Sequence, residues 1–581
     1  MSLFINNKVE KTFFELSGIR RRLILILFLA GFITLIFRAL YLQSLRKDFL
    51  QSKGNAVSVR VQSLYAERGK ITDRHGDILA SNSPVAIVRV NPANFKINKN
   101  QKLELQDILN LTSDELDQKL LNNKKEFDLK KDLSPDDERR LNTQKIPGIF
   151  TRKEYKRFYP HADITANLVG ITNIDNIGQE GIELFQNKIL TGKIGSRKVL
   201  IDRNRKTVAN LDLEEGRLPQ DGHDIKLSID RGIQYFTYRE LVKSIDIHKA
   251  KAGAAIVLDA KTGEILALVN LPSYNPNNLN ENGGPTRNRA LTDKFEPGST
   301  IKPFIVSSVL DAGILNPNSL VDVTSGFIKI GSSTIHDVHA DQNKPFMTVS
   351  EVIMKSSNVG SIKIGLFQTP KNLWSTLNKV GFGMQTGSGF PGEVPGTLRD
   401  YKNWTKLDQA TICIGHSIDL TLLQLAQSYT VFANEGEMRP VTLFKKEEIP
   451  MGTKVFSKQT VKAMVEMMEQ VVEHGTAGNA KIIGYRVAGK TGTAEKIVNG
   501  TYDKNKNIAS FVGLAPASNP RIIMAVMIDE PTVRSHFGGG VAAPVFSNVM
   551  AQVMKKLKIP QDKKPQIKVL PQDSINSNET I

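Results

Sequence analysis

The chain has 581 residues, a formal net charge of +18 and 40% hydrophobic residues. This composition predicts two or three globular domains and excludes a largely disordered chain or a polytopic membrane protein. Its single cysteine excludes a disulfide framework and any Cys-rich zinc or iron–sulfur site. Because its basic residues are spread along the chain without a zinc finger, an RNP-type motif or a basic helix, we expect no nucleic-acid partner and instead an anionic membrane or polymer nearby.

The first predicted element is a transmembrane helix near the N-terminus. Leu23–Leu42 is an apolar stretch of 20 residues, which at about 1.5 Å per residue spans about 30 Å, the hydrocarbon thickness of a bilayer. Arg38 lies close enough to its end to extend into the headgroups. The alternative, a secretory signal peptide, requires small residues after the apolar core, and the chain offers a poor cleavage site there. Because Arg20–Arg22 precede the stretch, we predict a cytoplasmic tail at residues 1–19, an anchor at residues 20–42 and an exported body.

Two regions of different composition follow the anchor. Residues 43–56 are polar and predict a stalk, whereas Val57–Gln62 alternates apolar and polar residues, as a half-buried strand does. Asp107–Lys145 is highly charged and has apolar residues at helical spacing, which predicts a small helical subdomain. At the other end of the chain, residues 558–581 are rich in Lys, Pro, Asn and Ser and predict a disordered tail.

The body from residue 225 onward has predicted strands near both of its ends and predicted helices between them. The strands are Ile225–Ile229, Ala254–Leu258, Ile265–Val269, Ile508–Leu514 and Ile522–Ile528, and the helices are Gly232–Val242, Phe304–Leu310 and Leu422–Phe432. The turn-forming residues Asp259–Gly263 predict a hairpin between two of the strands. This order indicates the α/β (α+β) class, with a sheet that joins early and late parts of the chain.

The chemically informative residues begin with Ser299 and Lys302. If the preceding Pro-Gly opens a helix, a serine and a lysine three residues apart lie on one face, where the amine can reach the hydroxyl. Serine becomes a nucleophile when an adjacent base takes its proton, and a lysine whose pKa is lowered by burial or by nearby cations can be that base. The pattern is weak alone, because Ser44 and Lys47 in the stalk have the same spacing.

A second group lies at Ser356-Ser-Asn358. Ser356 could relay a proton between Lys302 and a leaving amine, and Asn358 could donate to and accept from a substrate amide. The competing interpretation is a helix N-cap, which is a common use of such residues.

A third group is the stretch Lys490–Thr493, which comes soon after Tyr485–Val487 and can be the end of a strand. The lysine supplies positive charge for a carboxylate, the threonine hydroxyls supply donors, and Gly492 leaves room where a substrate backbone approaches. The same Lys-Thr-Gly tripeptide occurs at Lys261–Gly263. It lies in the predicted hairpin turn, where lysine and glycine are ordinary, so we assign it no catalytic role.

Together the groups at Ser299, Ser356 and Lys490 place S-x-x-K, S-x-N and K-T-G in the order that is the signature of penicillin-recognising serine acyltransferases. The chain resembles the class B penicillin-binding proteins on these motifs, and most of all their division-specific members. Further segments that resemble class B motifs are Arg68–Gly76, Arg157–Pro160, Gly178–Glu183 and Gly538–Phe546. The resemblance extends from about Arg20 to about Val553.

One stretch that resembles the family, Cys413–Gln424, also departs from its pattern. Cys413, Ser417 and Leu422 stand where the family usually has serine, glycine and proline. These departures concern the detail of the substrate cleft rather than the chemistry. Because Cys413 lies in an apolar stretch, we expect it to be buried packing rather than a nucleophile.

The resemblance implies a fold and a set of site residues. It implies a noncatalytic pedestal of the dimerisation type at residues 43–220 and a transpeptidase domain at residues 225–557, in which an antiparallel sheet lies between helical layers. The implied catalytic residues are Ser299 as nucleophile, Lys302 as base, Ser356, Asn358 and Lys490, and the implied substrate-binding residues are Thr491, Gly492 and Thr493. The backbone N–H groups of Ser299 and Thr493 would form the oxyanion hole, and no metal or cofactor is implied.

The resemblance also implies a substrate, partners and a location. The substrate would be the stem peptide of nascent peptidoglycan, and β-lactams would acylate the same serine. An FtsW-type glycan polymerase and other division proteins of the membrane would bind the anchor and the pedestal. The protein would be a single-pass protein of the cytoplasmic membrane with its catalytic domain in the periplasm.

Four alternatives were weighed against this interpretation. A metal hydrolase would use His336 and His339 with the nearby aspartates Asp337 and Asp341, but the spacing is not H-E-x-x-H, and histidines in surface loops are common. A β-lactamase or a β-lactam sensor shares the serine–lysine core, but the long pedestal argues against a simple lactamase. The intact motifs argue against a scaffold without activity. An elongation-specific class B enzyme would use identical chemistry.

Overall fold

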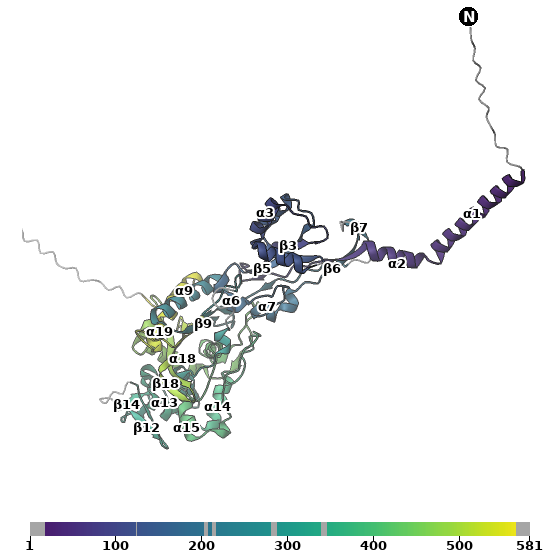
Figure 1. The fold of residues 1–581 in the computed structure, drawn as a ribbon. Coiled ribbons are helices and arrows are strands. Elements are labelled where there is room, and N and C mark those ends of the chain that lie inside the picture. The colour runs from purple at the N-terminus through teal and green to yellow at the C-terminus, as the bar shows by residue number, and fades with distance from the viewer. Residues whose placement is uncertain are drawn as a thin grey trace, which may run out of the picture. The chain divides into compact units, whose positions relative to one another are not determined.

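The computed structural model describes residues 18–123, 125–202, 207–211, 217–279, 287–338 and 345–564 (Figure 1). Contacts divide the chain into two compact units. The first comprises residues 1–66 and 193–220, and the second comprises residues 67–192 and 221–581. Each unit therefore combines segments that are separated in the sequence.

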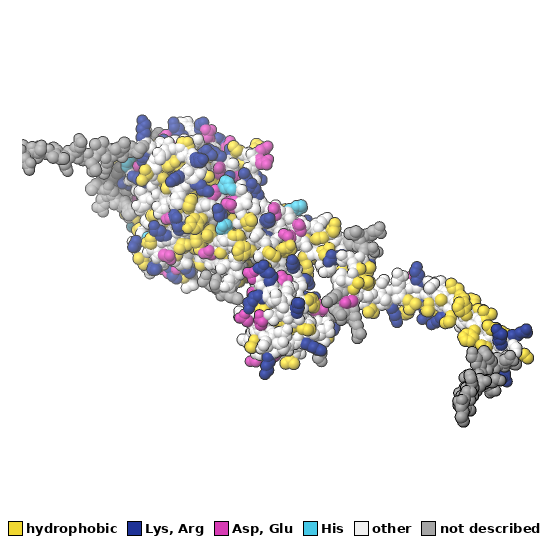
Figure 2. Space-filling model, turned by 90° about the horizontal axis from the view of Figure 1, so that it is seen from above, with side chains coloured by type: hydrophobic (Ala, Val, Ile, Leu, Met, Phe, Trp, Pro, Cys, Tyr) yellow, Lys and Arg dark blue, Asp and Glu magenta, His cyan; other side chains and the backbone are white. Residues whose placement is uncertain are grey.

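The first unit begins with helix α1 (Gly18–Ser44), which has 27 residues and buries none of them. Among the described residues it is the one helix that is long and apolar enough to cross a membrane. Figure 2 shows its apolar side chains exposed along the helix, with basic side chains at the end next to the grey N-terminal residues. These are the properties that a single-pass anchor requires, because the apolar side chains can then be buried in lipid.

The rest of the first unit is a helix and a small sheet. Helix α2 (Lys47–Ser58) occupies most of the segment predicted as a polar stalk and leads directly into strand β1 (Val59–Leu64). Strand β1 pairs antiparallel with β6 (Gly195–Ile201), which pairs antiparallel with β7 (Thr207–Leu211). The predicted strand at Val57–Gln62 is thus confirmed, with its start shifted because α2 continues to Ser58.

The N-terminal part of the second unit is built on a sheet of five strands in which β3 pairs with both β4 and β5. The strands are β2 (Ile71–Thr72), β3 (Ile78–Val90), β4 (Phe127–Leu133), β5 (Ile149–Phe158) and β8 (Ile225–Lys226). Helices α3 (Lys99–Leu109), α4 (Ser113–Asn122) and α5 (Pro135–Thr143) contribute to one core with β3 and β4. The predicted helical subdomain at Asp107–Lys145 thus contains the end of α3, all of α4 and α5, and in addition a strand, β4, that was not predicted. Its apolar residues also fit β4, in which Leu129 and Leu133 are buried beside the helices.

Three of the segments that resemble class B motifs, those at Arg68, Arg157 and Glu183, meet in a buried ion-pair network. The Glu183 carboxylate accepts from Arg68 Nε at 2.7 Å and from Arg157 Nε at 2.6 Å, and all three side chains are at most 2% exposed. Arg68 also donates to the side chains of Asn187 and Thr191 at 2.8 Å each. Because isolated buried charges are costly, these partners depend on one another to stay ionised in the interior.

The larger sheet of the second unit has the strand order β10-β9-β19-β18-β17 and is antiparallel throughout. Its strands are β9 (Ala252–Asp259), β10 (Ile265–Leu271), β17 (Ala488–Val498), β18 (Thr501–Ala515) and β19 (Ile522–Asp529). The predicted hairpin and the two predicted late strands are thereby confirmed, and so is the sheet that joins early and late chain. Strand β17 lies at an edge of the sheet, which leaves its outer side free for pairing.

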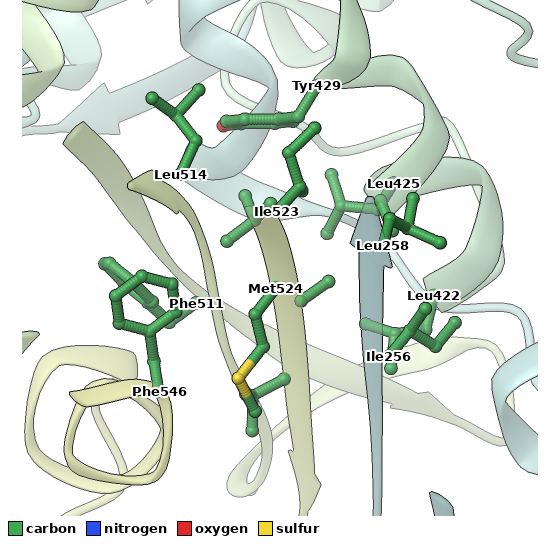
Figure 3. Packing of buried hydrophobic residues seen from close by; sticks show 14 of the residues in the cluster. Ile256, Leu258, Leu422, Leu425, Tyr429, Phe511, Leu514, Ile523, Met524 and Phe546 are labelled. Carbon is green, nitrogen blue, oxygen red and sulfur yellow. The ribbon is translucent and has the colours of Figure 1, made fainter. Parts of the chain in front are cut away.

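Helices cover both faces of this sheet (Figure 3). Ile256 and Leu258 of β9 point toward Leu422 and Leu425 of α16 (Leu422–Ser428). On the other side, the ring of Phe511 packs edge-on against Phe546 of α19 (Gly538–Lys556), with centroids 4.9 Å apart. A strand that is buried on both faces has a continuous run of apolar residues. For this reason β9 and β19 could be predicted from the sequence.

The remaining helices and strands of the second unit lie around the two sheets. The helices are α6 (Ala166–Val169), α7 (Gly181–Phe185), α8 (Asn187–Leu190), α9 (Arg231–His248), α10 (Arg289–Thr292), α11 (Lys302–Asp311), α12 (Val349–Lys355), α13 (Asn358–Gly365), α14 (Pro370–Lys379), α15 (Lys406–Ile412), α17 (Thr430–Ala433) and α18 (Lys458–Glu473). Short strands are β11 (Leu320–Asp322), β12 (Phe327–Ile330), β13 (Ser333–His336), β14 (Phe346–Thr348), β15 (Glu437–Met438) and β16 (Thr453–Lys454).

Two predicted segments differ from the structure in detail. The single helix predicted at Leu422–Phe432 is divided into α16 and α17 at Tyr429, whose hydroxyl donates to the carbonyl of Thr300 at 2.8 Å. The first residues of the predicted disordered tail are held by contacts with the rest of the second unit. Asp562 accepts from the backbone N–H of Arg486 at 2.7 Å, and Lys563 pairs with Glu473 at 2.6 Å. Residues 565–581 lie outside the described residues.

The buried carboxylate of Glu183 gives a prediction about stability. Glu183→Gln should lower the free energy of unfolding by about 3–5 kcal/mol, because it leaves two buried guanidinium groups without a counter-charge. Asp117→Asn, which breaks a half-exposed pair with Lys102 at 2.8 Å, should cost less than about 1 kcal/mol. Urea unfolding of the detergent-solubilised chain, followed by circular dichroism, measures both, and equal losses in the two variants would contradict the argument.

Candidate active site

Ser299 lies in a tight turn that begins helix α11. Residues Gly298–Ile301 form a single 3-10 turn, and α11 starts at Lys302. Gly298 has a φ of +53°, and a Cβ there would lie 2.9 Å from the backbone oxygen of Thr493. Only glycine fits such a conformation at such a close approach. The turn therefore holds Ser299, which is partly exposed, directly beside strand β17.

Lys302 is completely buried at the first residue of α11, and its amine faces the loop between α12 and α13. Its Nζ donates to the carbonyl of Ser356 at 2.7 Å, to Asn358 Oδ1 at 2.8 Å and to the carbonyl of Ser357 at 3.2 Å. Burial lowers the pKa of Lys302 to about 7, although the negative charge of Asp337 opposes the shift. Within the described residues these hydrogen bonds go to the loop rather than to Ser299.

Ser356 connects two buried lysines. Its hydroxyl accepts from Lys490 Nζ at 2.9 Å and from Lys302 Nζ at 3.4 Å. The residue has a φ of +60° at the end of α12, a left-handed conformation that is uncommon for serine and is often found at functional sites. The hydroxyl predicted to relay protons therefore lies between the two amines that would exchange them.

Asn358 is the first residue of α13, and the preceding Ser357 is the N-cap. Its Oδ1 accepts from Lys302, and its Nδ2 donates to the carbonyl of His336 at 2.9 Å. Both ends of the amide that was predicted to bind substrate are thus engaged inside the protein. A substrate amide would have to share or replace one of these contacts.

Asp337 is a site residue whose role the sequence analysis missed. Its carboxylate accepts from the Ser357 hydroxyl at 2.9 Å and from the backbone N–H groups of Asn358 and Val359. A carboxylate at a helix N-terminus is favourable because it satisfies free N–H groups. Asp337 thereby holds the start of α13 in place, and with it the loop that receives Lys302. No local capping pattern shows this, because the two segments are about 20 residues apart.

Asp337 follows His336, the first histidine of the rejected metal cluster. His336 is exposed, whereas His339 and Asp341 lie outside the described residues. Among the described residues, no group of His, Cys, Asp and Glu side chains is arranged to hold a metal ion.

Lys490 lies near the start of β17, not at the end of a strand as predicted. Besides its contact with Ser356, its Nζ donates to the carbonyl of Thr491 at 3.3 Å. Complete burial lowers the pKa of Lys490 well below its usual value, and the charge of Lys302 lowers it further. The two lysines thus oppose each other's protonation and titrate as a coupled pair.

Gly492 is also required by neighbours inside the protein, a constraint that the sequence analysis did not foresee. A Cβ there would lie 2.4 Å from Ser510 Oγ and 2.7 Å from the carbonyl of Pro297. The threonines on either side are also held, because Thr491 Oγ1 lies 2.9 Å from Thr476 Oγ1 and Thr493 Oγ1 accepts from the N–H of Gly538 at 3.1 Å. Gly538 begins the last segment that resembles a class B motif.

Glu296, three residues before Ser299, joins three elements around the nucleophile. Its carboxylate accepts from His416 Nδ1 at 2.7 Å, from the backbone N–H of Ser417 at 2.8 Å and from the Tyr502 hydroxyl at 3.1 Å. Burial and the charge of Glu296 raise the pKa of Tyr502. The sequence analysis missed this cluster, because the partners of Glu296 lie 120 to 206 residues away from it.

The departures from the family pattern at Cys413–Gln424 have structural explanations. Ser417 has a φ of +60°, which glycine would adopt without strain. Leu422 is the first residue of α16, a position that suits proline. Cys413 is buried as predicted, and burial raises the pKa of its thiol to about 12. A thiol with such a raised pKa is inert as a nucleophile.

The second Lys-Thr-Gly tripeptide lies in the β9–β10 turn, as predicted. The backbone N–H groups of Lys261 and Thr262 donate to Asp259 Oδ1 at 2.9 and 3.0 Å, and Gly263 has a φ of +72°. The amine of Lys261 donates to the carbonyl of Ala433 at 2.7 Å. None of these contacts involves the lysine pair.

Comparisons with known proteins agree with this geometry. Residues 253–551 match the family described as penicillin binding protein transpeptidase domain, and residues 63–227 match the penicillin-binding protein dimerisation domain. The chain is 40% identical over 533 residues to a probable peptidoglycan D,D-transpeptidase PenA of Neisseria gonorrhoeae, covering 91% of each chain. It is 37% identical over 541 residues to the peptidoglycan D,D-transpeptidase FtsI of Escherichia coli, covering 91% of this chain and 90% of the other.

Solved structures extend the likeness to the fold. The transpeptidase domain of penicillin-binding protein 3 from Burkholderia pseudomallei matches with a TM-score of 0.54 at 44% identity, covering 58% of this chain and 98% of that one. Penicillin-binding protein 3 of Mycobacterium tuberculosis, solved in complex with aztreonam, matches with a TM-score of 0.67 at 27% identity, covering 87% of this chain and 99% of that one. With a transpeptidase domain, a dimerisation domain and relatives that match along most of its length, the chain belongs to the class B penicillin-binding proteins.

Proposed function

We propose that the chain is a peptidoglycan D,D-transpeptidase that cross-links stem peptides through an ester on Ser299. The observation that carries this proposal is the hydroxyl of Ser356 between the buried amines of Lys302 and Lys490, beside the turn that presents Ser299. Such a group can move protons in both directions, which acyl transfer needs twice, once to form the ester and once to resolve it. The names of the relatives support the same reaction class.

The reaction begins when Ser299 Oγ attacks the carbonyl of the penultimate D-Ala of the donor peptide. The peptide bond breaks, and the terminal D-Ala leaves with a proton on its amine. An amine of a neighbouring strand then attacks the ester, loses a proton and releases the free Ser299 hydroxyl. The net result is a new amide cross-link and one free D-Ala.

Lys302 is the proposed general base. With a pKa of about 7, a large share of its amine is neutral near neutral pH, and an efficient base has a pKa near the working pH. Ser356 passes the proton toward the leaving amine, because it contacts both lysines. Lys490, close to the edge of β17, is proposed to bind the carboxylate of the terminal D-Ala as an ammonium group, because a bound carboxylate raises the lowered pKa of a buried lysine.

The edge of β17 is the proposed binding site for the donor backbone. An extended peptide can add to a free strand edge through main-chain hydrogen bonds. Thr491, Gly492 and Thr493 would line this edge, and Asn358 would hold the donor from the other side. The backbone N–H groups of Ser299 and Thr493 are the proposed oxyanion hole, and one such donor typically contributes about 3–4 kcal/mol to the transition state.

The proposed position in the cell follows from α1. We infer a cytoplasmic tail at residues 1–19, an anchor at residues 20–42, a pedestal at residues 43–220 and a transpeptidase domain at residues 225–557 in the periplasm. The basic triplet Arg20–Arg22 supports this orientation. A phosphatase reporter that needs an oxidising compartment should be active when fused after Arg60, and an inactive fusion there would contradict the orientation.

We further propose a role in division, with an FtsW-type glycan polymerase and other division proteins bound through the anchor and the pedestal. The resemblance of the motifs to the division-specific members of the family motivates this role. Depletion in living cells separates the two roles, because filaments indicate division and round cells indicate elongation. Recovery of the polymerase with the intact chain, but not after exchange of α1 for an unrelated transmembrane helix, would support the proposed contact.

The nucleophile is tested with a labelled β-lactam, which opens on the attacking serine and leaves no amine to resolve the ester. Wild type should be labelled covalently and should stay labelled, whereas a lactamase would release the label. Ser299→Ala should not be labelled, since no other hydroxyl lies in the same turn position. Ser308→Ala, which removes a hydroxyl from the same helix, should label normally. Labelling of the Ser299→Ala variant at the wild-type level would refute the mechanism.

The base is tested by the pH dependence of β-lactam acylation. The rate constant should rise with pH through about 7, because Lys302 must lose its proton to act, and at lower pH it should fall by about tenfold per unit. Lys302→Arg should abolish this rise and slow acylation by orders of magnitude, since arginine stays protonated. Lys261→Arg, in the second tripeptide, should leave the profile unchanged. A normal profile in Lys302→Arg would move the base to another group.

The Glu296 cluster is tested by substitution and by a double-mutant cycle. Glu296→Gln should slow acylation by about tenfold or more, because a buried charge-assisted hydrogen bond contributes about 1.5–3 kcal/mol. Tyr502→Phe removes one neutral donor and should slow acylation by about two- to fivefold, which corresponds to about 0.5–1 kcal/mol. The double variant should lose less acylation rate than the product of the two single losses. If the losses are fully additive as free energies, Tyr502 acts independently of Glu296.

A further inference from the structure

A second basic group lies apart from the lysine pair, in a cavity of about 640 Å³ near the other end of β17. Apolar side chains, among them Phe295 and Met527, form part of its wall. Cationic side chains from separate segments surround it. These are Lys251, Arg287, Arg289, Lys294 and Lys496. None of them takes part in the proposed acyl transfer.

The charges around this cavity are not balanced on its α10 side. Arg287 and Arg289 share one carboxylate, that of Asp293, with contacts of 2.7 Å each. Lys294 donates to the neutral hydroxyl of Thr397 at 3.2 Å, and among the described residues no carboxylate lies within ion-pair distance of it. Asp419 feels the charge of Lys294 only from farther away. Among the described residues, the three cations on this side thus share one carboxylate, which leaves two positive charges in excess.

On the opposite side the cations are neutralised. Lys496 contacts Asp529 at 2.8 Å and Glu530 at 2.7 Å, and Lys251 lies 3.4 Å from Glu530. The unbalanced charge is thus confined to the segment Arg287–Lys294. This segment leads directly into Phe295, Glu296 and the nucleophile turn.

The position of the cavity relative to the nucleophile follows from the register of β17. The nucleophile turn touches β17 at Thr493, since a Cβ on Gly298 would lie 2.9 Å from the Thr493 oxygen. Lys490 lies three residues before Thr493 and Lys496 three residues after it. At about 3.3 Å per residue, Lys496 is about 10 Å along the strand from the nucleophile turn.

A donor peptide beside β17 would therefore have its two ends near different cations. Its terminal carboxylate lies toward Lys490 in the proposed function, so the residues that precede the acylated D-Ala lie toward Lys496 and the cavity. Each extended residue covers about 3.3 Å, so the two preceding residues reach across this distance. A carboxylate on either of them would lie toward these excess charges. Arg287 already holds Asp293 through Nε and Nη2, so among the described residues its Nη1 is the group that can donate to a further carboxylate.

We propose that this cavity is a subsite for a carboxylate carried by the donor peptide on the residues that precede the acylated D-Ala, with Arg287 and Lys294 as the recognising cations. The proposal rests on the proposed transpeptidase function and adds a specificity to it. The apolar wall would pack against the carbon chain of the same residue, as pockets with a few placed polar groups commonly do. Arg287 and Lys294 bind substrate here and take no part in the proton transfers.

The test uses two synthetic donor peptides that end in D-Ala-D-Ala. They differ only in whether the two residues before this pair carry free carboxylates or carboxamides, and the release of terminal D-Ala by the detergent-solubilised chain is measured with each. Wild type should prefer the carboxylate peptide by about fivefold or more in kcat/KM, mainly through KM. Because the charges are exposed, the preference should shrink when the ionic strength is raised from about 0.02 M to about 0.5 M.

The informative variant is Arg287→Gln combined with Lys294→Gln. It removes the two excess charges and leaves Arg289 paired with Asp293, so both the fold and the acylation of Ser299 by a β-lactam should be unchanged. The preference between the two peptides should fall below about twofold.

A matched control is Lys454→Gln combined with Lys481→Gln. Lys481 shares Glu473 with Lys563, and Lys454 donates to a neutral carbonyl, that of Glu435 at 2.7 Å. The control should keep the wild-type preference. Equal rates with both peptides in wild type, or a preference that survives in the Arg287 and Lys294 variant, would overturn the subsite. Absent β-lactam labelling of Ser299 in wild type would instead overturn the proposed function.

Discussion

Two lysine amines in one water-poor pocket are the constraint around which the active site is organised. Taking an ammonium group out of water costs several kcal/mol even after the protein relaxes, and Lys302 and Lys490 are both completely buried. They are tolerated because oxygen atoms surround them. Lys302 is held by carbonyls and an amide oxygen of the α12–α13 loop, and Lys490 is held by Ser356 and its own strand. The same burial that is costly lowers the pKa of both lysines, and it brings that of Lys302 to about 7, which makes its neutral amine available as a base.

The loop that receives these amines has to be held from outside. Ser356 adopts a left-handed conformation, and strain of that kind persists only where the surroundings impose it. Asp337 imposes it from a different segment by satisfying the first N–H groups of α13. On the other side of the nucleophile, Glu296 binds donors from two further segments. Two carboxylates thus position the parts of a site whose chemistry is done by lysines and serines.

Close backbone contacts bring these parts together. Gly298 meets β17, Gly492 meets the nucleophile turn and Ser510, and Gly538 would meet the carbonyls of Ser510 and Gly492 at 2.1 and 2.5 Å if it carried a Cβ. A side chain at any of these glycines would push the turn, the edge strand and α19 apart. The glycines of the motifs therefore serve the packing of the protein against itself, and the space for substrate lies along the outer edge of β17.

The sequence by itself determined the features that depend on nearby residues. The length and polarity of Leu23–Leu42 predicted α1, the apolar runs predicted β9, β10, β18 and β19, and the order of the motifs at Ser299, Ser356 and Lys490 indicated the family. These signals are local, because helix and strand periodicities and motif spacings lie within a few residues of one another. A local pattern gave an incomplete prediction where both a helix and a strand fit the same spacing of apolar residues. In this way the strand β4 was not foreseen within the helical subdomain at Asp107–Lys145. The division of one predicted helix into α16 and α17 was not foreseen either.

Only the tertiary structure decided which groups complete the site. Asp337, Glu296 and Thr476 have no motif of their own, and each acts on residues that are 15 to 206 positions away. The cavity at Arg287 and Lys294 likewise combines segments that meet only when the sheet has formed. The pKa of Lys302 belongs to this level as well, because a lysine in water keeps its proton and only burial among fixed oxygen atoms lowers its affinity for it. The motifs identify the reacting groups, whereas the folded interior determines the pKa values of these groups and the distances between them.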